Sequence, residues 1–190
     1  MTAPVIVPAT VRTRWTDGRV SGDGVMHAER RLRDLGAVFA DSDAWASGPP
    51  DQLVYRTSCV FPVPDGTEAG LFWGTTFLQP GTVGGEYFMT KGHVHAKSDR
   101  MEVYFTFAGT GLLILMDPKR SCRVEEMTPG SVHLIPAHAA HRTVNIGDVE
   151  LSFGACWPSD AGYNYDVIAR TGFSVRAMRG AGGRPDLVVV

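Results

Sequence analysis

The chain has 190 residues, a formal net charge of −2 at neutral pH, and 44% hydrophobic against 20% charged residues. These values fit one globular domain with a sizeable core, because domains typically run to roughly 100–200 residues. The near-neutral charge and the lack of a basic block predict no nucleic-acid binding and no membrane-surface binding.

The N-terminal segment, residues 1–15, has prolines within its apolar part and no charged region before it, so we do not expect a signal peptide. No apolar run approaches the roughly 18 residues of a membrane span. Cys59, Cys122 and Cys156 are odd in number and lie outside any C-x-x-C pair, which favours free, buried thiols. The sequence therefore predicts a soluble, cytoplasmic protein without a disulfide framework.

The N-terminal part of the chain carries one hairpin signal and one helix signal. Residues 5–20 predict a hairpin that turns at Thr16–Gly18. Residues 27–35, HAERRLRDL, are rich in strong helix formers and are followed by Gly36, which predicts a helix. We assign residues 1–50 to an arm that carries this helix.

From Gln52 onward the pattern changes to short β-branched or aromatic segments separated by turn residues. Such strands at short intervals predict an antiparallel barrel or sandwich, with its core over about residues 51–160. The C-terminal segment, 161–190, is expected to end in a hairpin. The predicted strands are LVYRTSCVF, LFWGTTFL, GEYFMT, VYFTFAG, GLLILMD, VHLIPA, RTVNIGD, LSFGACW, FSVRAM and DLVVV.

Residues 90–104, TKGHVHAKSDRMEVY, place two histidines one residue apart and a glutamate seven residues after the second. Alternate side chains of a strand share a face, so His93 and His95 are expected to point the same way. The polar, turn-like segment between them and the next strand lets Glu102 return to that face, followed by Tyr104. Two imidazoles and one carboxylate can therefore converge on one point.

The stretch GSVHLIPAHAAHRTVN, residues 130–145, supplies three more histidines, and either His138 or His141 can complete a site of three nitrogens and one oxygen. This set suits one divalent transition metal, with coordination positions left open for substrate or water. The ligand set does not choose among Fe, Mn, Ni, Co and Zn.

Both stretches follow the sequence motifs of the cupins. Residues 130–145 match the second cupin motif at every position, except that His138 replaces a glycine. The first motif is met by His93, His95, Glu102 and Gly109, with a six-residue gap before the glutamate and a displaced leading glycine. The chain thus resembles a cupin, which implies one domain over 1–190. The fold implied is a double-stranded β-helix, or jelly-roll barrel, with a short N-terminal helical arm.

The departures point to one branch of that family. Four segments, TKGHVHAKSDRMEVY, RRLRDLGAVFADSDAW, TTFLQPG and WPSDAGYNYDVIARTGF, together with AHRTVNIGD, resemble the cupin-type phosphoglucose isomerases. The resemblance covers most of residues 28–175. It implies a metal-dependent homodimer that interconverts glucose 6-phosphate and fructose 6-phosphate in glycolysis and gluconeogenesis. The metal ligands it implies are His93, His95, Glu102 and His141.

The same resemblance assigns residues that would bind the substrate. Phosphate contacts fall on Thr76, Thr90 and Gly92, with Lys91 the weaker candidate. The sugar pocket would be lined by Tyr55, Tyr104 and Tyr165, which otherwise read as packing residues. Two positions depart from the family pattern: Trp157 stands where a phosphate-contacting tyrosine is common, and Tyr163 where the family often has histidine. The remaining histidines, His27 and His133, read as structural, and His138 as a weaker ligand candidate than His141.

An aldose–ketose isomerase moves hydrogen between C1 and C2 of the open-chain sugar. Glu102 is the only carboxylate that the motifs place in the cavity, so it serves as the base of an enediol route or purely as a ligand in a hydride shift. Fe²⁺ is the first expectation for the metal. The alternatives are another metal-dependent cupin enzyme such as a dioxygenase, or a non-catalytic cupin that binds a sugar phosphate.

Overall fold

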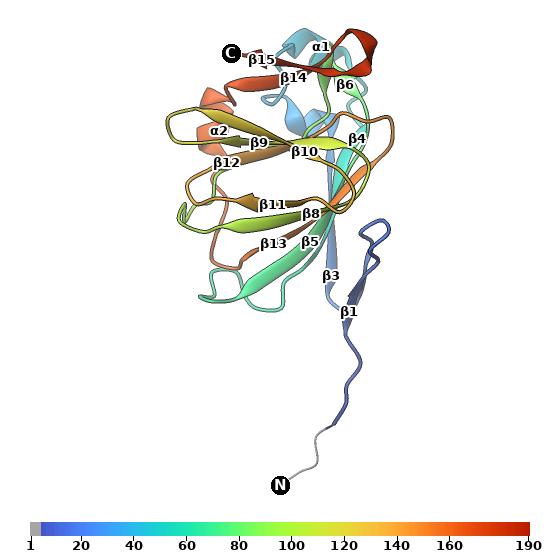
Figure 1. Cartoon of the computed structure of the whole chain (residues 1–190), viewed down its shortest axis with the longest axis vertical. Helices are drawn as coiled ribbons and strands as arrows, with labels where there is room; N and C mark the ends of the chain where they lie inside the picture. The colour runs from blue at the N-terminus through green and yellow to red at the C-terminus, as the bar shows by residue number, and fades with distance from the viewer. Residues whose placement is uncertain (1–4) are drawn as a thin grey trace.

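The computed structural model describes residues 5–190, which form an all-β jelly roll built from antiparallel strands (Figure 1). The larger sheet has six strands in the order β11 (Val132–Ile135), β8 (Glu102–Ala108), β13 (Leu151–Pro158), β5 (Leu71–Leu78), β4 (Leu53–Val60) and β3 (Val25–Arg31). The smaller sheet has three, in the order β10 (Cys122–Met127), β9 (Gly111–Met116) and β12 (Ala140–Asn145).

Successive strands change sheets. β8 lies in the larger sheet, β9 and β10 in the smaller, β11 in the larger, β12 in the smaller and β13 in the larger. β8 and β12 therefore pair with segments that do not follow them directly in the sequence, β13 and β9, and the two sheets share one core. All six residues of β9 and all six of β12 are buried. The predicted all-β jelly roll is confirmed.

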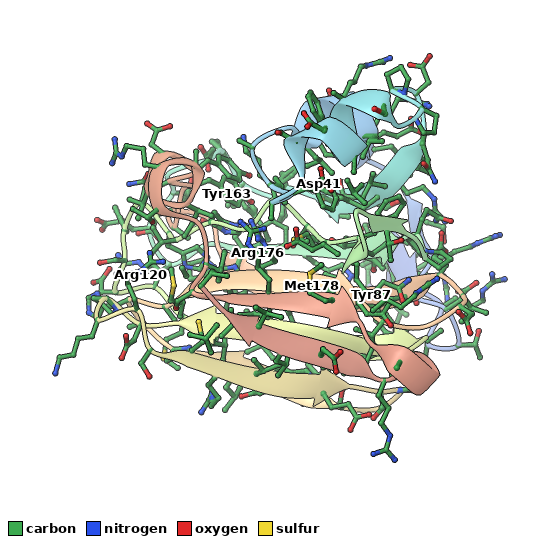
Figure 2. The ribbon with its side chains drawn as sticks, turned by 90° about the horizontal axis from the view of Figure 1, so that it is seen from above. Asp41, Tyr87, Arg120, Tyr163, Arg176 and Met178 are labelled. Carbon is green, nitrogen blue, oxygen red and sulfur yellow. The ribbon has the colours of Figure 1, made fainter. Side chains whose placement is uncertain are left out.

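A four-stranded sheet lies across one end of the molecule, in the order β15 (Pro185–Val189), β14 (Val175–Arg179), β7 (Glu86–Tyr87) and β6 (Thr82–Val83). The predicted C-terminal hairpin is its β14–β15 pair, which passes through a 3₁₀ turn, η2 (Ala181–Gly183). Viewed from above, Arg176 and Met178 of β14 are seen on this hairpin (Figure 2). Arg176 donates to the buried carboxylate of Glu86 at 2.8 and 2.9 Å, which ties the hairpin to the body.

The N-terminal hairpin is confirmed, with bounds that differ from the predicted ones. β1 (Val11–Thr13) pairs with β2 (Val20–Gly22), from Val11 opposite Gly22 to Thr13 opposite Val20. Before it, residues 5–10 extend away from the body of the molecule (Figure 1). Val5, Ile6 and Val7 are among the most exposed apolar side chains described.

The predicted helix over 27–35 is wrong for most of its length. Residues 25–31 form β3, the edge strand of the larger sheet, paired with β4 from Val25 opposite Val60 to Arg30 opposite Tyr55. Only Leu32–Leu35 turns as a 3₁₀ helix, η1, with both leucines buried. Differences in helix propensity are below about 1 kcal/mol per residue, so pairing along a whole strand outweighs them. Because these residues form a strand and not a helix, Arg30 lies beside the central cavity.

Three short elements have weak sequence signals. β10 is polar and half exposed. The six-residue helices are α1 (Ser42–Ser47), capped by Asp41, and α2 (Asp166–Thr171), which follows the DAGYNY segment. Within residues 5–190 no helix is long and apolar enough to cross a membrane. The three cysteines are free, as predicted, but partly rather than fully buried.

Candidate active site

Two backbone segments bring the histidines together. His93 forms an isolated antiparallel bridge with His141 of β12: His93 N–H donates to the His141 carbonyl at 3.2 Å, and His141 N–H to the His93 carbonyl at 2.9 Å. The two imidazole ring centroids consequently lie 4.3 Å apart. Glu102, the first residue of β8, enters the same space from the larger sheet.

His93, His95, Glu102 and His141 each offer one ligand atom, and these four atoms all lie within 4.8 Å of one another. Glu102 Oε2 is 3.2 Å from His95 Nε2 and 3.1 Å from His141 Nε2. The structure therefore brings together the four side chains proposed as ligands. His138 is not among them, because its Nδ1 lies 2.9 Å from Ser98 Oγ on the surface.

The loop between His95 and Glu102 orients His95. Its Nδ1 lies 2.9 Å from the carbonyl oxygen of Arg100, so that Nδ1 carries the proton and Nε2 faces the cluster. The Arg100 guanidinium donates to the buried carboxylate of Asp160 at 3.0 and 2.8 Å, and Lys97 Nζ donates to it at 2.9 Å. The six-residue gap thus forms a loop tied to the end of β13.

The cluster fits a divalent transition metal. Among residues 5–190, the Nε2 atoms of His93 and His141 are buried without a hydrogen-bond partner, although His141 Nε2 lies close to Glu102. A buried polar atom left unpaired costs about 1–3 kcal/mol, and a metal ion would satisfy both. Three imidazole nitrogens and one carboxylate oxygen are suited to Fe, Mn, Co, Ni or Zn.

The protonation states of His93 and Glu102 agree with a ligand role. For His95, burial alone would lower the pKa, but the hydrogen bond to Glu102 outweighs it and raises the pKa. Burial and the neighbouring His141 lower the pKa of His93 well below its usual value, which keeps its imidazole neutral. Burial alone would raise the pKa of Glu102, but the adjacent His141 and His95 outweigh it and hold the pKa at about 2. A neutral imidazole and an ionised carboxylate are the forms that bind metals.

A cavity of about 260 Å³ opens beside the cluster. Every residue proposed from the sequence to contact substrate or metal lines it, apart from His95, which is buried, and the weaker ligand candidate His138. These lining residues are Tyr55, Thr76, Thr90, Lys91, Gly92, His93, Glu102, Tyr104, His141, Trp157, Tyr163 and Tyr165.

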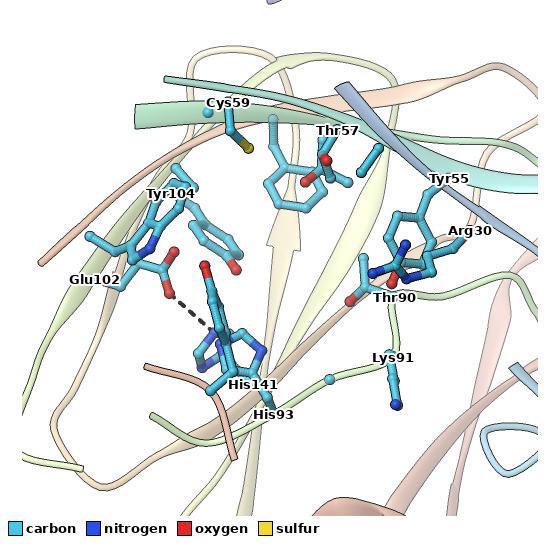
Figure 3. Close-up of a pocket in the computed structure, with 18 of the residues that line it drawn as sticks. Arg30, Tyr55, Thr57, Cys59, Thr90, Lys91, His93, Glu102, Tyr104 and His141 are labelled. Atoms are coloured by element: carbon cyan, nitrogen blue, oxygen red, sulfur yellow. Dashed lines mark ion pairs between the residues drawn. The ribbon is translucent and has the colours of Figure 1, made fainter. Parts of the chain in front are cut away.

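The two ends of the cavity differ in charge. Glu102, Tyr104, His93 and His141 gather at one end, whereas Arg30 and Lys91 lie with Tyr55 and Thr90 at the other (Figure 3). The two cationic side chains offer charge to an anion at that end.

Aromatic side chains flank the histidines. The rings of Tyr163 and Tyr165 stack, with their centroids 5.8 Å apart and an interplanar angle of 15°. The centroid of the His93 imidazole lies 4.9 Å from that of Tyr163 and 5.6 Å from that of Tyr165. Burial raises the pKa of Tyr163 and of Tyr165, and raises that of Tyr104 well above its usual value. These phenols are therefore neutral near pH 7 and can donate hydrogen bonds.

The other histidines make protein contacts, as the sequence indicated. His27 Nδ1 lies 2.9 Å from Ser58 Oγ, and His133 Nδ1 lies 2.6 Å from Glu125 Oε2. His138 has a φ of +66°, a left-handed conformation that favours glycine. This explains why the cupin motif carries glycine at that position.

Sequence reasoning missed several cavity residues, of which Arg30 and Glu29 carry charge. Both fall within the helix predicted over residues 27–35. They line the cavity because these residues instead form β3, paired with β4. Glu29 adds a second carboxylate to the cavity wall. However, its Oε2 lies 2.6 Å from Arg31 Nη2 and its side chain is 47% exposed. Of the two carboxylates that line the cavity among residues 5–190, Glu102 is the one beside His93 and His141.

A family model described as glucose-6-phosphate isomerase matches residues 29–184. The glucose-6-phosphate isomerase of Thermococcus litoralis is 44% identical over 147 residues, covering 76% of both chains. That of Pyrococcus furiosus is 43% identical over 154 residues, covering 80% of both. A bacterial relative of the same name, from Sinorhizobium medicae, is 39% identical over 147 residues, covering 76% of this chain and 68% of the relative.

Among solved structures, an oxalate oxidase in complex with glycolate aligns with a TM-score of 0.45 at 12% identity, over 78% of this chain and 58% of that one. A Bacillus subtilis oxalate decarboxylase mutant aligns with a TM-score of 0.46 at 19% identity, over 63% and 29%. This chain thus spans less than two thirds of either structure.

Proposed function

The chain belongs to the glucose-6-phosphate isomerase family, and on that basis we propose that it interconverts glucose 6-phosphate and fructose 6-phosphate. One divalent transition metal takes part in the reaction. Its ligands are His93, His95, Glu102 and His141.

One observation carries the proposal. Four ligand atoms within 4.8 Å of one another lie at one end of a cavity, and two cationic side chains lie at its other end. All of these residues fall inside the segment that matches the family. A sugar phosphate has the matching asymmetry, with a dianion at one end and two reacting oxygens at the other. A dioxygenase acting on an apolar substrate would have no use for Arg30 and Lys91. The family match likewise favours the isomerase.

The substrate lies along the cavity in the orientation that these charges impose. Its phosphate is bound at the Arg30 and Lys91 end by the hydroxyls of Thr90 and Thr76 and by the backbone N–H of Gly92. Its C1 and C2 oxygens lie beside the histidine cluster. The neutral phenols of Tyr104, Tyr163 and Tyr165 donate hydrogen bonds to the sugar hydroxyls between these two ends, and Tyr55 and Trp157 complete the wall.

A divalent metal held by the three histidines and Glu102 would supply Lewis-acid stabilisation of the negative charge that develops on the C1 and C2 oxygens. Glu102 has a different role in each of the two possible routes of isomerisation. In an enediol route its carboxylate takes the proton from one carbon and returns it to the other; in a 1,2-hydride shift it is purely a metal ligand. Turnover in D₂O separates them, because the first route admits deuterium at the transferred position and the second does not.

Four finer features belong to the same proposal: the native metal, the location, the oligomeric state and the domain organisation. Fe²⁺ is the native metal, with Mn²⁺, Ni²⁺, Co²⁺ and Zn²⁺ as alternatives that the donor set also accepts. The enzyme is a cytoplasmic homodimer whose protomer is one domain over residues 1–190. The extended residues 5–10, with their exposed Val5, Ile6 and Val7, offer apolar surface to a second copy. Light scattering coupled to gel filtration measures the dimer.

The test is a coupled assay that follows glucose 6-phosphate formed from fructose 6-phosphate. It is run on the purified protein, after chelation, and after each divalent metal is added back. Loss on chelation and recovery with a metal support the proposal. Absence of turnover with every metal rejects it, and O₂ uptake with another substrate would identify the dioxygenase alternative.

A further inference from the structure

Arg142 is a buried cation that the proposed chemistry leaves unused. It follows His141 in β12, is 4% exposed, and has no carboxylate in ion-pair contact within residues 5–190. The carboxylate of Glu86 is already taken by Arg176 and by the backbone N–H of Ala40. A buried charge without an ion-pair partner is costly.

Its guanidinium is held by two contacts. Nη2 donates to the carbonyl oxygen of Lys91 at 2.9 Å, and Cζ lies 4.5 Å from the centre of the Phe173 ring. Nε is buried without a partner among the described residues. Side chains alternate along a strand, so Arg142 points away from the cavity that His141 faces, and it is absent from the cavity lining.

The contact with Lys91 determines where the next amide points. The Lys91–Gly92 peptide bond is trans, so its carbonyl and its N–H point in opposite directions. The carbonyl is directed at buried Arg142, and the Gly92 N–H is therefore directed towards the cavity that both residues line. Within the described chain this N–H makes no backbone hydrogen bond.

The turn has little freedom to adopt another orientation. Gly92 has a φ of +73°, and a Cβ there would lie 2.8 Å from Phe173 Cε2 and 3.1 Å from Arg142 Nε. On the far side, Thr90 N–H donates to the Thr143 carbonyl at 2.9 Å, and Thr143 N–H donates to Thr90 Oγ1 at 3.1 Å. Arg142 therefore packs directly against the turn that carries the amide.

We propose that Arg142 is a positioning residue for the substrate phosphate, acting through the Lys91–Gly92 peptide. Its guanidinium holds the Lys91 carbonyl so that the Gly92 N–H donates to the phosphate, and its uncompensated charge adds to the attraction for a dianion. This inference rests on the proposed function for the identity of the anion as a sugar phosphate.

Kinetics on the metal-loaded enzyme test the role. In Arg142→Met, the KM for fructose 6-phosphate and the inhibition constant of inorganic phosphate rise together by about tenfold or more, since hydrogen bonds to charged groups carry differences of that order. The value of kcat changes less than threefold. Arg142→Lys, which keeps the charge and a donor, recovers part of the loss. A folded Arg142→Met enzyme with both constants within twofold of wild type overturns the inference, as does a fall in kcat alone.

Arg56 offers a matched control. Its guanidinium also lies over an aromatic ring, 3.9 Å from the centre of Phe77, but it does not line the cavity. Arg56→Met leaves the KM and the phosphate inhibition constant unchanged if the effect of Arg142 is specific. An equal rise in both constants in Arg56→Met contradicts the inference.

A second measurement needs neither variant to fold. Lys91–Gly92 is the sole Lys–Gly pair in the sequence, so protein labelled with ¹³C-carbonyl lysine and ¹⁵N-glycine gives one amide resonance for Gly92. In the wild-type, zinc-loaded protein this resonance shifts on addition of fructose 6-phosphate and not of fructose. No shift at saturating fructose 6-phosphate overturns the inference. Because this reads binding without turnover, it separates a failed inference from a failed isomerase assignment.

Discussion

Gly92→Ala tests whether the turn before the histidines is dictated by its backbone. At a φ of +73°, a residue with a side chain is strained by roughly 1–2 kcal/mol. About 0.4–1 kcal/mol of that is offset because alanine restricts the unfolded chain. The new Cβ would also lie 2.8 Å from Phe173 Cε2, and overpacking of this kind adds about 1–3 kcal/mol. Together these terms predict a loss of about 1–5 kcal/mol in the free energy of unfolding, with a central value of about 3 kcal/mol.

Gly66→Ala is the matched control. Gly66 has a φ of +85°, and a Cβ there meets no atom within 4 Å. Only the backbone terms apply, so we expect a loss of about 0–1.6 kcal/mol, with a central value of about 0.8 kcal/mol. Urea unfolding of both variants measures the difference directly, and the KM for fructose 6-phosphate should rise in Gly92→Ala alone. Equal losses of stability in the two variants would refute the packing argument.

Four further predictions address the site and its frame. His141→Ala loses bound metal and activity together, whereas His138→Ala keeps both, as metal analysis and the coupled assay will show; the opposite result would reverse the ligand assignment. Glu102→Gln keeps part of the metal but loses at least about 100-fold in kcat if the carboxylate is the base, and a smaller loss would favour a ligand role alone. Asn145 bonds three backbone groups while fully buried, so Asn145→Ala should lower the free energy of unfolding by about 2–3 kcal/mol in urea titrations, and a loss below about 1 kcal/mol would contradict this. Hydrogen bonds from Arg100 and Lys97 lower the pKa of Asp160 below its usual 3.8; the associated stability is fully present above pH 3.8 and is lost progressively as the pH falls from there towards the lowered pKa, so wild type should lose more stability than Asp160→Asn in thermal melts from pH 5 to about 2.

The strands of the jelly roll could be predicted because their signals are local. LFWGTTFL matches β5 residue for residue, since β-branched and aromatic residues bounded by turns favour a strand in any context. HAERRLRDL failed because its propensity is also local, whereas the pairing of Val25–Arg31 with β4 is not. β10 was overlooked because its polar residues, CRVEEM, carry little β signal of their own.

The metal-site cluster could be predicted from motif spacing. The reason proposed from the sequence, that alternate side chains of one strand share a face, is not what brings these residues together. His93 and His95 do not lie on a long strand; a single bridge to His141 and the carbonyl of Arg100 orient them. That geometry depends on segments roughly 50 and 60 residues further along the chain, including Asp160. Spacing within one segment cannot report such contacts.

The residues that sequence reasoning missed share one property. Arg30 reaches the cavity from an edge strand, and Arg142 acts through the carbonyl of Lys91 from behind the cavity wall. Neither residue belongs to a motif whose spacing implies its role. Burial and the direction of one peptide bond assign Arg142, and these quantities exist only once the chain is folded.

The central claim is that this chain isomerises a sugar phosphate and that three histidines and Glu102 would hold the metal it needs. The most direct measurement is the rate of glucose 6-phosphate formation from fructose 6-phosphate, with bound metal quantified in the same sample, for wild type and His93→Ala. Wild type should turn over with about one metal per chain, lose activity on chelation and regain it when a divalent metal is restored, while His93→Ala shows neither metal nor turnover. Full activity in a metal-free sample, or none with any metal, would contradict it.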